Sequence, residues 1–198
     1  MRVVPEDWMP ECEMKRIICH WTGGNYEAAD DELDHFHIPV LQDGSLLCGN
    51  HSIAANGKPR SARYAAHTLN CNTESIGISV CCMADANESP FDGGKCPMTD
   101  WQWEVLAQVA ADLAQRYGIR VTPQTILGHG EVKTNLGIEQ RGKWDPLMLP
   151  WEPTLSKKEV GDRFRARCKR CSRWSSVCGG ATEAALHAPL RELPWSCR

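Results

Sequence analysis

The sequence predicts an α+β fold in which a central mixed β-sheet is flanked by helices. Three observations support this: several short apolar runs of strand length, one long amphipathic helix with clear end signals, and no strict alternation of strands with helices. The 198 residues are 42% hydrophobic and 24% charged, which is ordinary for a globular protein. This length suits one domain with an appendage.

Two of the apolar runs end in a histidine. KRIICHW (residues 15–21) is followed by the turn-forming TGGN, so it predicts a buried strand that presents His20 near its C-terminal end. IRVTPQTILGH (residues 119–129) predicts another strand, which delivers His129. Both histidines would therefore lie at strand ends.

Two further runs predict strands, and one stretch predicts a loop. FHIPVLQDGSLLCG (residues 36–49) has apolar runs on both sides of Asp-Gly, which readily forms a tight hairpin turn. ESIGISVCCM (residues 74–83) combines β-branched residues with cysteine and predicts a central strand. Pro and Gly punctuate residues 84–98, which we expect to be irregular.

The clearest helix begins after Thr99. The Thr99 hydroxyl and the Gln102 side chain have the spacing of a capping box, and Gly118 supplies the stop. An apolar stripe recurs every four residues between them. It consists of Trp101, Val105, Val109, Leu113 and Tyr117.

Charge divides the chain into two parts. Residues 1–156 contain 12 Lys and Arg against 21 Asp and Glu, whereas residues 157–198 contain 10 against 4. We therefore predict an acidic body over residues 1–153 and a flexible, basic, cysteine-containing tail over residues 154–198. Such a tail suits anionic polymers or a membrane surface. No nucleic acid is expected, because no reader motif accompanies the charge.

The tail also contains a Cys-x-x-Cys pair, Cys168 and Cys171, which is half of a structural zinc site. Cys178 and either His187 or Cys197 would have to complete it. A flexible segment without metal is the simpler interpretation.

The N-terminal segment is charged throughout and lacks the apolar core of a signal peptide. No window approaches the roughly 20 apolar residues that span a bilayer. These features predict synthesis in the cytoplasm, where the eleven cysteines would be mostly buried, reduced thiols rather than a disulfide framework.

Three residues could share a metal ion. His20, His129 and Asp145 are the donor types that zinc accepts, with a fourth position left for water. Their spacing alone does not decide the matter, because a single histidine is more often a satisfied core or surface residue.

Four motifs occur together in a characteristic order: IICHWTGG, HFHIPVLQDGSLLCG, AAHTLNCNTESIGISV, and ILGHGEV followed by GKWDP. Over roughly residues 15–150 they resemble the zinc-dependent N-acetylmuramoyl-L-alanine amidase family, which includes phage endolysins and peptidoglycan-recognition proteins. The resemblance implies that the body, residues 1–153, is a catalytic domain acting on bacterial peptidoglycan. It would hydrolyse the amide between the lactyl group of N-acetylmuramic acid and L-alanine.

The resemblance also implies residue roles. One catalytic Zn²⁺ would be held by His20, His129 and Asp145, and Lys143 would stabilise the oxyanion of the reaction. Without the resemblance, a solvated charge or a salt bridge is the simpler role for Lys143. His67 and Asn72 fall in a loop that lines the substrate groove in relatives, although turn formation and local capping explain them equally well.

The chain departs from the family pattern at the proton shuttle. Many relatives have a glutamate where this chain has Ser79, and others have a tyrosine where it has Phe36. The proton transfer would then fall to Lys143, to the zinc-bound water or to a residue that the sequence does not identify. Glu131 is a weaker candidate, because a carboxylate that supports the site or lies on the surface is the simpler interpretation.

Three functions are compatible with these features. A phage or prophage endolysin would remain in the cytoplasm until a holin opened a route to the wall. A cytoplasmic amidase would recycle soluble muropeptides, and a binding module would recognise peptidoglycan without cutting it. Retention of all three zinc-ligand types favours an enzyme. Oligomeric state is not predicted.

Overall fold

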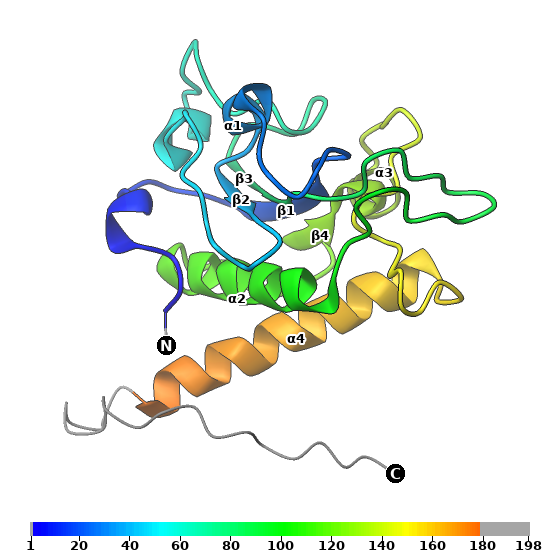
Figure 1. The fold of residues 1–198 in the computed structure, drawn as a ribbon. Coiled ribbons are helices and arrows are strands. Elements are labelled where there is room, and N and C mark those ends of the chain that lie inside the picture. The colour runs from blue at the N-terminus through cyan, green and yellow to red at the C-terminus, as the bar shows by residue number, and fades with distance from the viewer. Residues whose placement is uncertain (1, 179–198) are drawn as a thin grey trace.

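A computed structural model of the chain describes residues 2–178, with side chains up to residue 171. Four strands form one sheet in the order β2-β3-β1-β4, and all three neighbouring pairs are parallel (Figure 1). The strands are β1 (Arg16–Trp21), β2 (Ile38–Val40), β3 (Ser75–Val80) and β4 (Ile126–Gly128).

Within residues 2–178, four α-helices and three short 3-10 helices accompany the sheet. The α-helices are α1 (Asp30–His35), α2 (Asp100–Arg116), α3 (Val132–Leu136) and α4 (Lys157–Cys178). The 3-10 helices are η1 (Glu6–Trp8), η2 (Ile53–Asn56) and η3 (His129–Glu131).

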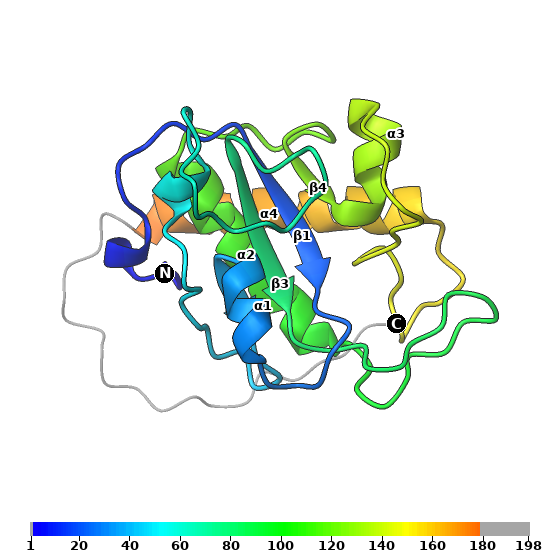
Figure 2. The ribbon, with the colours of Figure 1, turned by 90° about the horizontal axis from the view of Figure 1, so that it is seen from above.

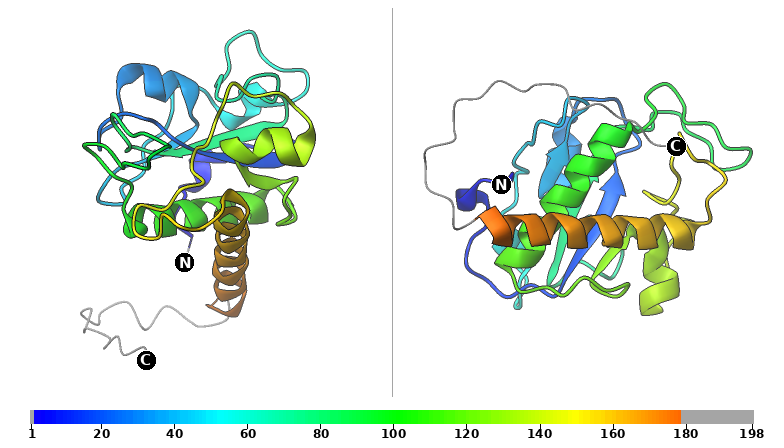
Figure 3. Two further views of the ribbon diagram at one scale, coloured as in Figure 1. Left: turned by 90° about the vertical axis from the view of Figure 1, so that its right-hand side faces the viewer. Right: turned by 90° about the horizontal axis from the view of Figure 1, so that it is seen from below.

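Helices α2 and α4 lie on one face of the sheet, and α1 and long loops cover the other (Figures 1 and 2). Seen from below, α4 crosses α2 and reaches the β4 edge of the sheet (Figure 3). Residues of β1 alternate between these faces. Ile17 and Cys19 belong to the main core that includes α2, whereas His20 lies on the opposite face, with Ser79 of β3 as its register partner.

The α+β fold class and the central strand are confirmed. The hairpin forms around Asp43 and Gly44, but its second arm is not a regular strand. It is held by a bridge between Val40 and Leu46 and by three backbone bonds, from Leu41 to Ser45, from Leu47 to Pro39 and from Gly49 to His37. This short arm is the antiparallel component of an otherwise parallel sheet.

The expected helix runs from Asp100 to Arg116, and the capping box of Thr99 and Gln102 forms as predicted. Trp101 differs from the prediction. It is 52% exposed, because it lies in the first turn and its indole N–H donates to the Asp43 carbonyl at 2.8 Å.

The expected flexible tail differs most from the structure. Its first part forms α4, whose residues Val160, Phe164 and Cys168 are buried in the same core as the sheet. Sequence reasoning weighed the basic charge and overlooked this apolar stripe at helical spacing. Cys168 is therefore a core residue. The side chain of Cys178, and both His187 and Cys197, lie outside the described part of the chain.

Of the nine cysteines whose side chains are described, five are buried, as expected: Cys19, Cys71, Cys81, Cys82 and Cys168. Burial raises the pKa of the Cys81 thiol to about 12, which keeps it protonated. Between residues 2 and 178, no helix has both the length and the apolar character required to cross a membrane.

Candidate metal centre

Three chain segments meet at the C-terminal edge of the sheet. His20 is the penultimate residue of β1, and His129 directly follows β4, the parallel neighbour of β1. Because parallel strands end at the same edge, the two imidazoles come together although 109 positions separate them. Asp145 joins them from the loop after α3, where its backbone carbonyl accepts from the Gly130 amide at 2.9 Å.

The three side chains converge on one carboxylate oxygen. Asp145 Oδ2 lies 3.1 Å from His20 Nδ1 and 3.3 Å from His129 Nδ1. One donor atom from each residue lies within 4.8 Å of the others, and all three residues are buried. Among the described residues, this is the group of histidine, cysteine and acidic side chains with the arrangement that a metal ion needs.

A second histidine determines which nitrogen of His20 can bind a metal. His67 Nε2 faces the Ser75 carbonyl at 3.3 Å, so it carries the proton, and His67 Nδ1 accepts. His20 Nε2 lies 3.3 Å from that nitrogen and 3.4 Å from the Thr68 hydroxyl, which is itself 2.8 Å from His67 Nδ1, so His20 Nε2 donates to this pair of acceptors. The lone pair of His20 is therefore at Nδ1, which points towards Asp145.

The side-chain amide of Gln140 determines which nitrogen of His129 can bind a metal. Gln140 Nε2 donates to the Leu69 carbonyl at 3.0 Å, which turns Gln140 Oε1 towards His129 Nε2 at 2.9 Å. His129 Nε2 therefore donates, and its lone pair is also at Nδ1. Sequence reasoning did not identify Gln140, because no local signal marks a glutamine eleven residues after a histidine.

These donors fit zinc. Two lone pairs and a carboxylate oxygen face one point, an arrangement that repels itself unless a cation lies between them. A tetrahedral ion with bonds of about 2.0–2.2 Å requires donors about 3.3–3.6 Å apart, close to the observed 3.1 and 3.3 Å. Hydrogen bonds that fix the non-ligating nitrogens are typical of protein zinc sites.

The protonation states agree with this fit. Burial lowers the pKa of His20 to about 4, so the imidazole is neutral near pH 7. A neutral His20 imidazole is therefore available as a ligand.

The centre opens into a groove of about 950 Å³. Lys143 lines this groove and is exposed, two residues before Asp145. Arg60, whose guanidinium lies 3.8 Å from the centre of the Tyr64 ring, forms another part of the wall. The groove is large enough for an extended substrate that passes the three donors.

A model of the N-acetylmuramoyl-L-alanine amidase family matches residues 10–147, which is more than half of the chain and includes all three donors. The chain belongs to this family.

Among solved structures, the Ph2119 endolysin from Thermus scotoductus MAT2119 bacteriophage Ph2119 is similar to this amidase-family chain. The two share 15% sequence identity with a TM-score of 0.44, over 79% of this chain and 88% of the endolysin chain. No curated protein matches the sequence.

The two residues expected to bind substrate have mainly internal contacts in this amidase fold. His67 is 7% exposed and supports His20, as described above. Asn72 Oδ1 accepts from the Thr68 amide at 2.8 Å, which is the local capping role that was the alternative. Both residues border the groove.

Ser79, Phe36 and Glu131 present no proton-transferring group to the groove. Ser79 is fully buried, and its hydroxyl has no hydrogen-bond partner among the described residues. Phe36 packs against His20 with ring centroids 5.1 Å apart. Glu131 is 7% exposed and faces α4 instead, so it has the supporting role that was the simpler interpretation.

Gly77 leaves space for the His67 ring, which supports His20 in this amidase-family chain. A Cβ at this position would overlap the His67 ring. We expect Gly77→Ala to lower the free energy of unfolding by about 1–3 kcal/mol through overpacking. Because it displaces His67, it should also weaken zinc binding, as measured by chelator competition.

The control for that variant is Ile76→Val on the same strand. Ile76 belongs to the main core on the other face, so the change should cost about 1 kcal/mol without altering zinc affinity. Equal zinc affinity in the two variants would contradict the claim that His67 orients His20 for zinc binding.

His37 predicts how stability depends on pH. Its Nδ1 accepts from the Gly77 amide at 3.0 Å, its Nε2 lies 3.2 Å from Asn56 Oδ1, and burial lowers its pKa from 6.5 to about 4. The unfolded chain thus gains this proton first as pH falls. The free energy of unfolding of the metal-free protein should fall between about pH 6.5 and 4, by about 3 kcal/mol for this group.

Urea unfolding at pH 7 and pH 4.5 measures this effect. His37→Asn keeps an acceptor for the Gly77 amide but does not titrate, so its stability should depend less on pH. A slope equal to that of the wild type would show that His37 does not titrate as described.

Proposed function

We propose that this chain is a zinc-dependent amidase of bacterial peptidoglycan. It would hydrolyse the amide between the lactyl group of N-acetylmuramic acid and L-alanine. The observation that carries the proposal is the convergence of His20 Nδ1, His129 Nδ1 and Asp145 Oδ2, with both other imidazole nitrogens committed to His67 and Gln140. Membership in the N-acetylmuramoyl-L-alanine amidase family supports this choice of bond.

Zinc held by His20, His129 and Asp145 would polarise the scissile carbonyl and lower the pKa of the attacking water towards neutrality. The chain contributes the remaining conditions. His67 and Gln140 keep the imidazoles oriented, so that little rearrangement is needed during the reaction. Burial of the three donors strengthens their electrostatic effect on the substrate.

Lys143 carries the second role in the proposal. Lys143 lines the groove and lies two residues before Asp145 in the chain. A positive charge there would stabilise the negative oxygen that develops on the scissile carbonyl.

The proposed biological role is that of a phage or prophage endolysin, with release to the cell wall through a holin. This requires the groove to accept a strand held in the wall. Turnover should therefore be faster on intact sacculi than on soluble muropeptides. The opposite order would favour a muropeptide-recycling amidase.

Product analysis tests the reaction. Digestion of purified peptidoglycan should release peptides with a free N-terminal L-alanine and leave glycan chains without new reducing ends. A chelator should stop the release, and added zinc should restore it. New reducing ends would contradict amide cleavage, and binding to sacculi without products would indicate a recognition module.

A further inference from the structure

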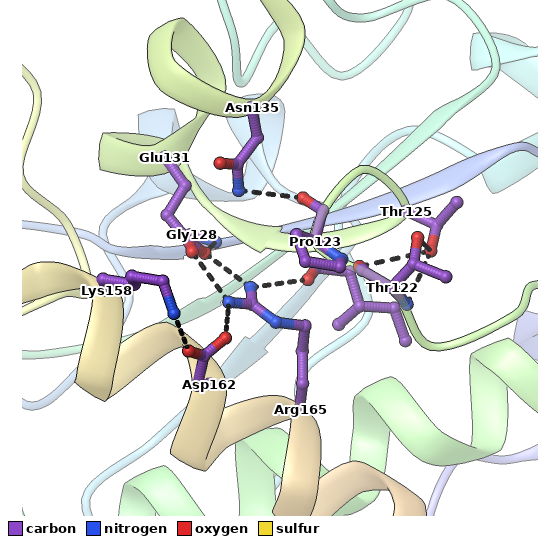
Figure 4. A network of polar contacts seen from close by, with 10 residues as sticks. Thr122, Pro123, Thr125, Gly128, Glu131, Asn135, Lys158, Asp162 and Arg165 are labelled. Carbon is purple, nitrogen blue, oxygen red and sulfur yellow. Dashed lines mark hydrogen bonds and ion pairs between the residues drawn. The ribbon is translucent and has the colours of Figure 1, made fainter.

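The C-terminal helix is joined to the metal centre by a buried ion pair. Arg165 of α4 and Glu131 of η3 are 5% and 7% exposed. Arg165 Nη1 lies 2.9 Å from Glu131 Oε2, and Nη2 lies 3.0 Å from Glu131 Oε1, so the pair is bidentate (Figure 4). Bidentate geometry makes this contact strong and directional.

Both partners have further contacts that hold them in place. Arg165 Nη1 donates to the Ile126 carbonyl at 3.2 Å, and Nη2 donates to Asp162 Oδ1 at 2.8 Å. Gly161 of α4 permits the close approach, because a Cβ there would overlap the Glu131 carboxylate. The helix is thus shaped to receive Glu131.

The Glu131 carboxylate also forms a hydrogen bond with the turn that carries His129. Glu131 Oε2 accepts from the Gly128 amide at 3.0 Å (Figure 4), and Gly128 directly precedes His129. On the other side of His129, the Gly130 amide donates to the Asp145 carbonyl at 2.9 Å. The backbone of His129 is therefore held from both sides, once through α4 and once through the loop of Asp145.

We propose that Arg165 is a positioning residue of the metal centre. Through Glu131 it fixes the turn that presents His129 Nδ1. Helix α4 therefore helps to position a metal ligand, although it lies outside the segment that the family model matches. The link to metal affinity rests on the proposed zinc centre. The effect on the turn does not require metal.

Hydrogen exchange in the metal-free protein tests the effect on the turn. In Arg165→Met, exchange at the Gly128 and Gly130 amides should be about 10-fold faster, as expected when one buried hydrogen bond is weakened. The Ile78 amide in β3 should be unchanged. Zinc affinity should fall by about 10-fold or more, the effect seen when supporting contacts of zinc ligands are removed.

Arg163→Met is the matched control. Arg163 lies on the same helix and pairs with Glu152, but both partners are about half exposed. Neither exchange at the turn nor zinc affinity should change in this variant.

In Arg165→Met the buried Glu131 carboxylate loses its partner, and this could prevent folding. A double variant provides the test in that case. Glu131→Met with Arg165→Met buries no unpaired charge, so it should fold. It still removes the acceptor of the Gly128 amide, so faster exchange and weaker zinc binding are again expected. Wild-type exchange at both glycines in this folded variant would overturn the proposal. Wild-type protein that binds no zinc would instead overturn the proposed function.

Discussion

Replacing Asp145 with asparagine should remove zinc from the protein and lower kcat/KM by about 1,000-fold, because several kcal/mol of charge stabilisation by the metal are lost. Asparagine has nearly the same volume but lacks the negative charge that faces the two Nδ1 atoms. Zinc content by mass spectrometry and release of N-terminal L-alanine measure the two effects.

Asp31→Asn is the control for this variant. Asp31 also lines the groove, but it is exposed on α1 and has no part in the group of three donors. It should keep one zinc per chain. If Asp145→Asn retained zinc and turnover, the assignment of the third ligand would be incorrect.

Replacing Lys143 with methionine should lower kcat by about 100-fold to 1,000-fold, the range for losing one group that stabilises a developing oxyanion. Zinc content should stay at the wild-type level, because the ammonium is not a ligand. Single-turnover kinetics on purified peptidoglycan, together with zinc analysis, separate the two effects.

Arg141→Met is a comparison for Lys143, since Arg141 is an exposed cation of the same loop and also lines the groove. It should change KM more than kcat if it only attracts substrate. Equal losses of kcat in the two variants would show that general charge in the groove, rather than Lys143, supports the reaction.

Local patterns predicted the elements that place the ligands. The apolar runs before His20 and His129 predicted two strands, and the capping box of Thr99 predicted the start of α2. Strand β4 covers only Ile126–Gly128 of the predicted residues 119–129. These signals lie within a few residues of the feature that they specify. The pairing of the two histidines required the family resemblance, because spacing along the chain does not show which strands are neighbours.

The supporting contacts could not be predicted in this way. Gln140 reaches the Leu69 carbonyl from 71 positions away, and Arg165 reaches Glu131 from 34 positions away. Each contact depends on how loops and helices pack in three dimensions. The basic charge of the last 42 residues suggested a flexible tail, whereas the buried side chains of α4 make its first part a component of the core.

The most direct test is a crystal structure of the zinc-loaded protein with anomalous data at the zinc absorption edge. We expect one peak between the three donors, bonded at about 2.0–2.2 Å to Nδ1 of His20, Nδ1 of His129 and Oδ2 of Asp145. The contacts from His20 to His67 and from His129 to Gln140 should persist. Bonding through Nε2 of either histidine, or a peak away from these residues, would contradict the proposed centre.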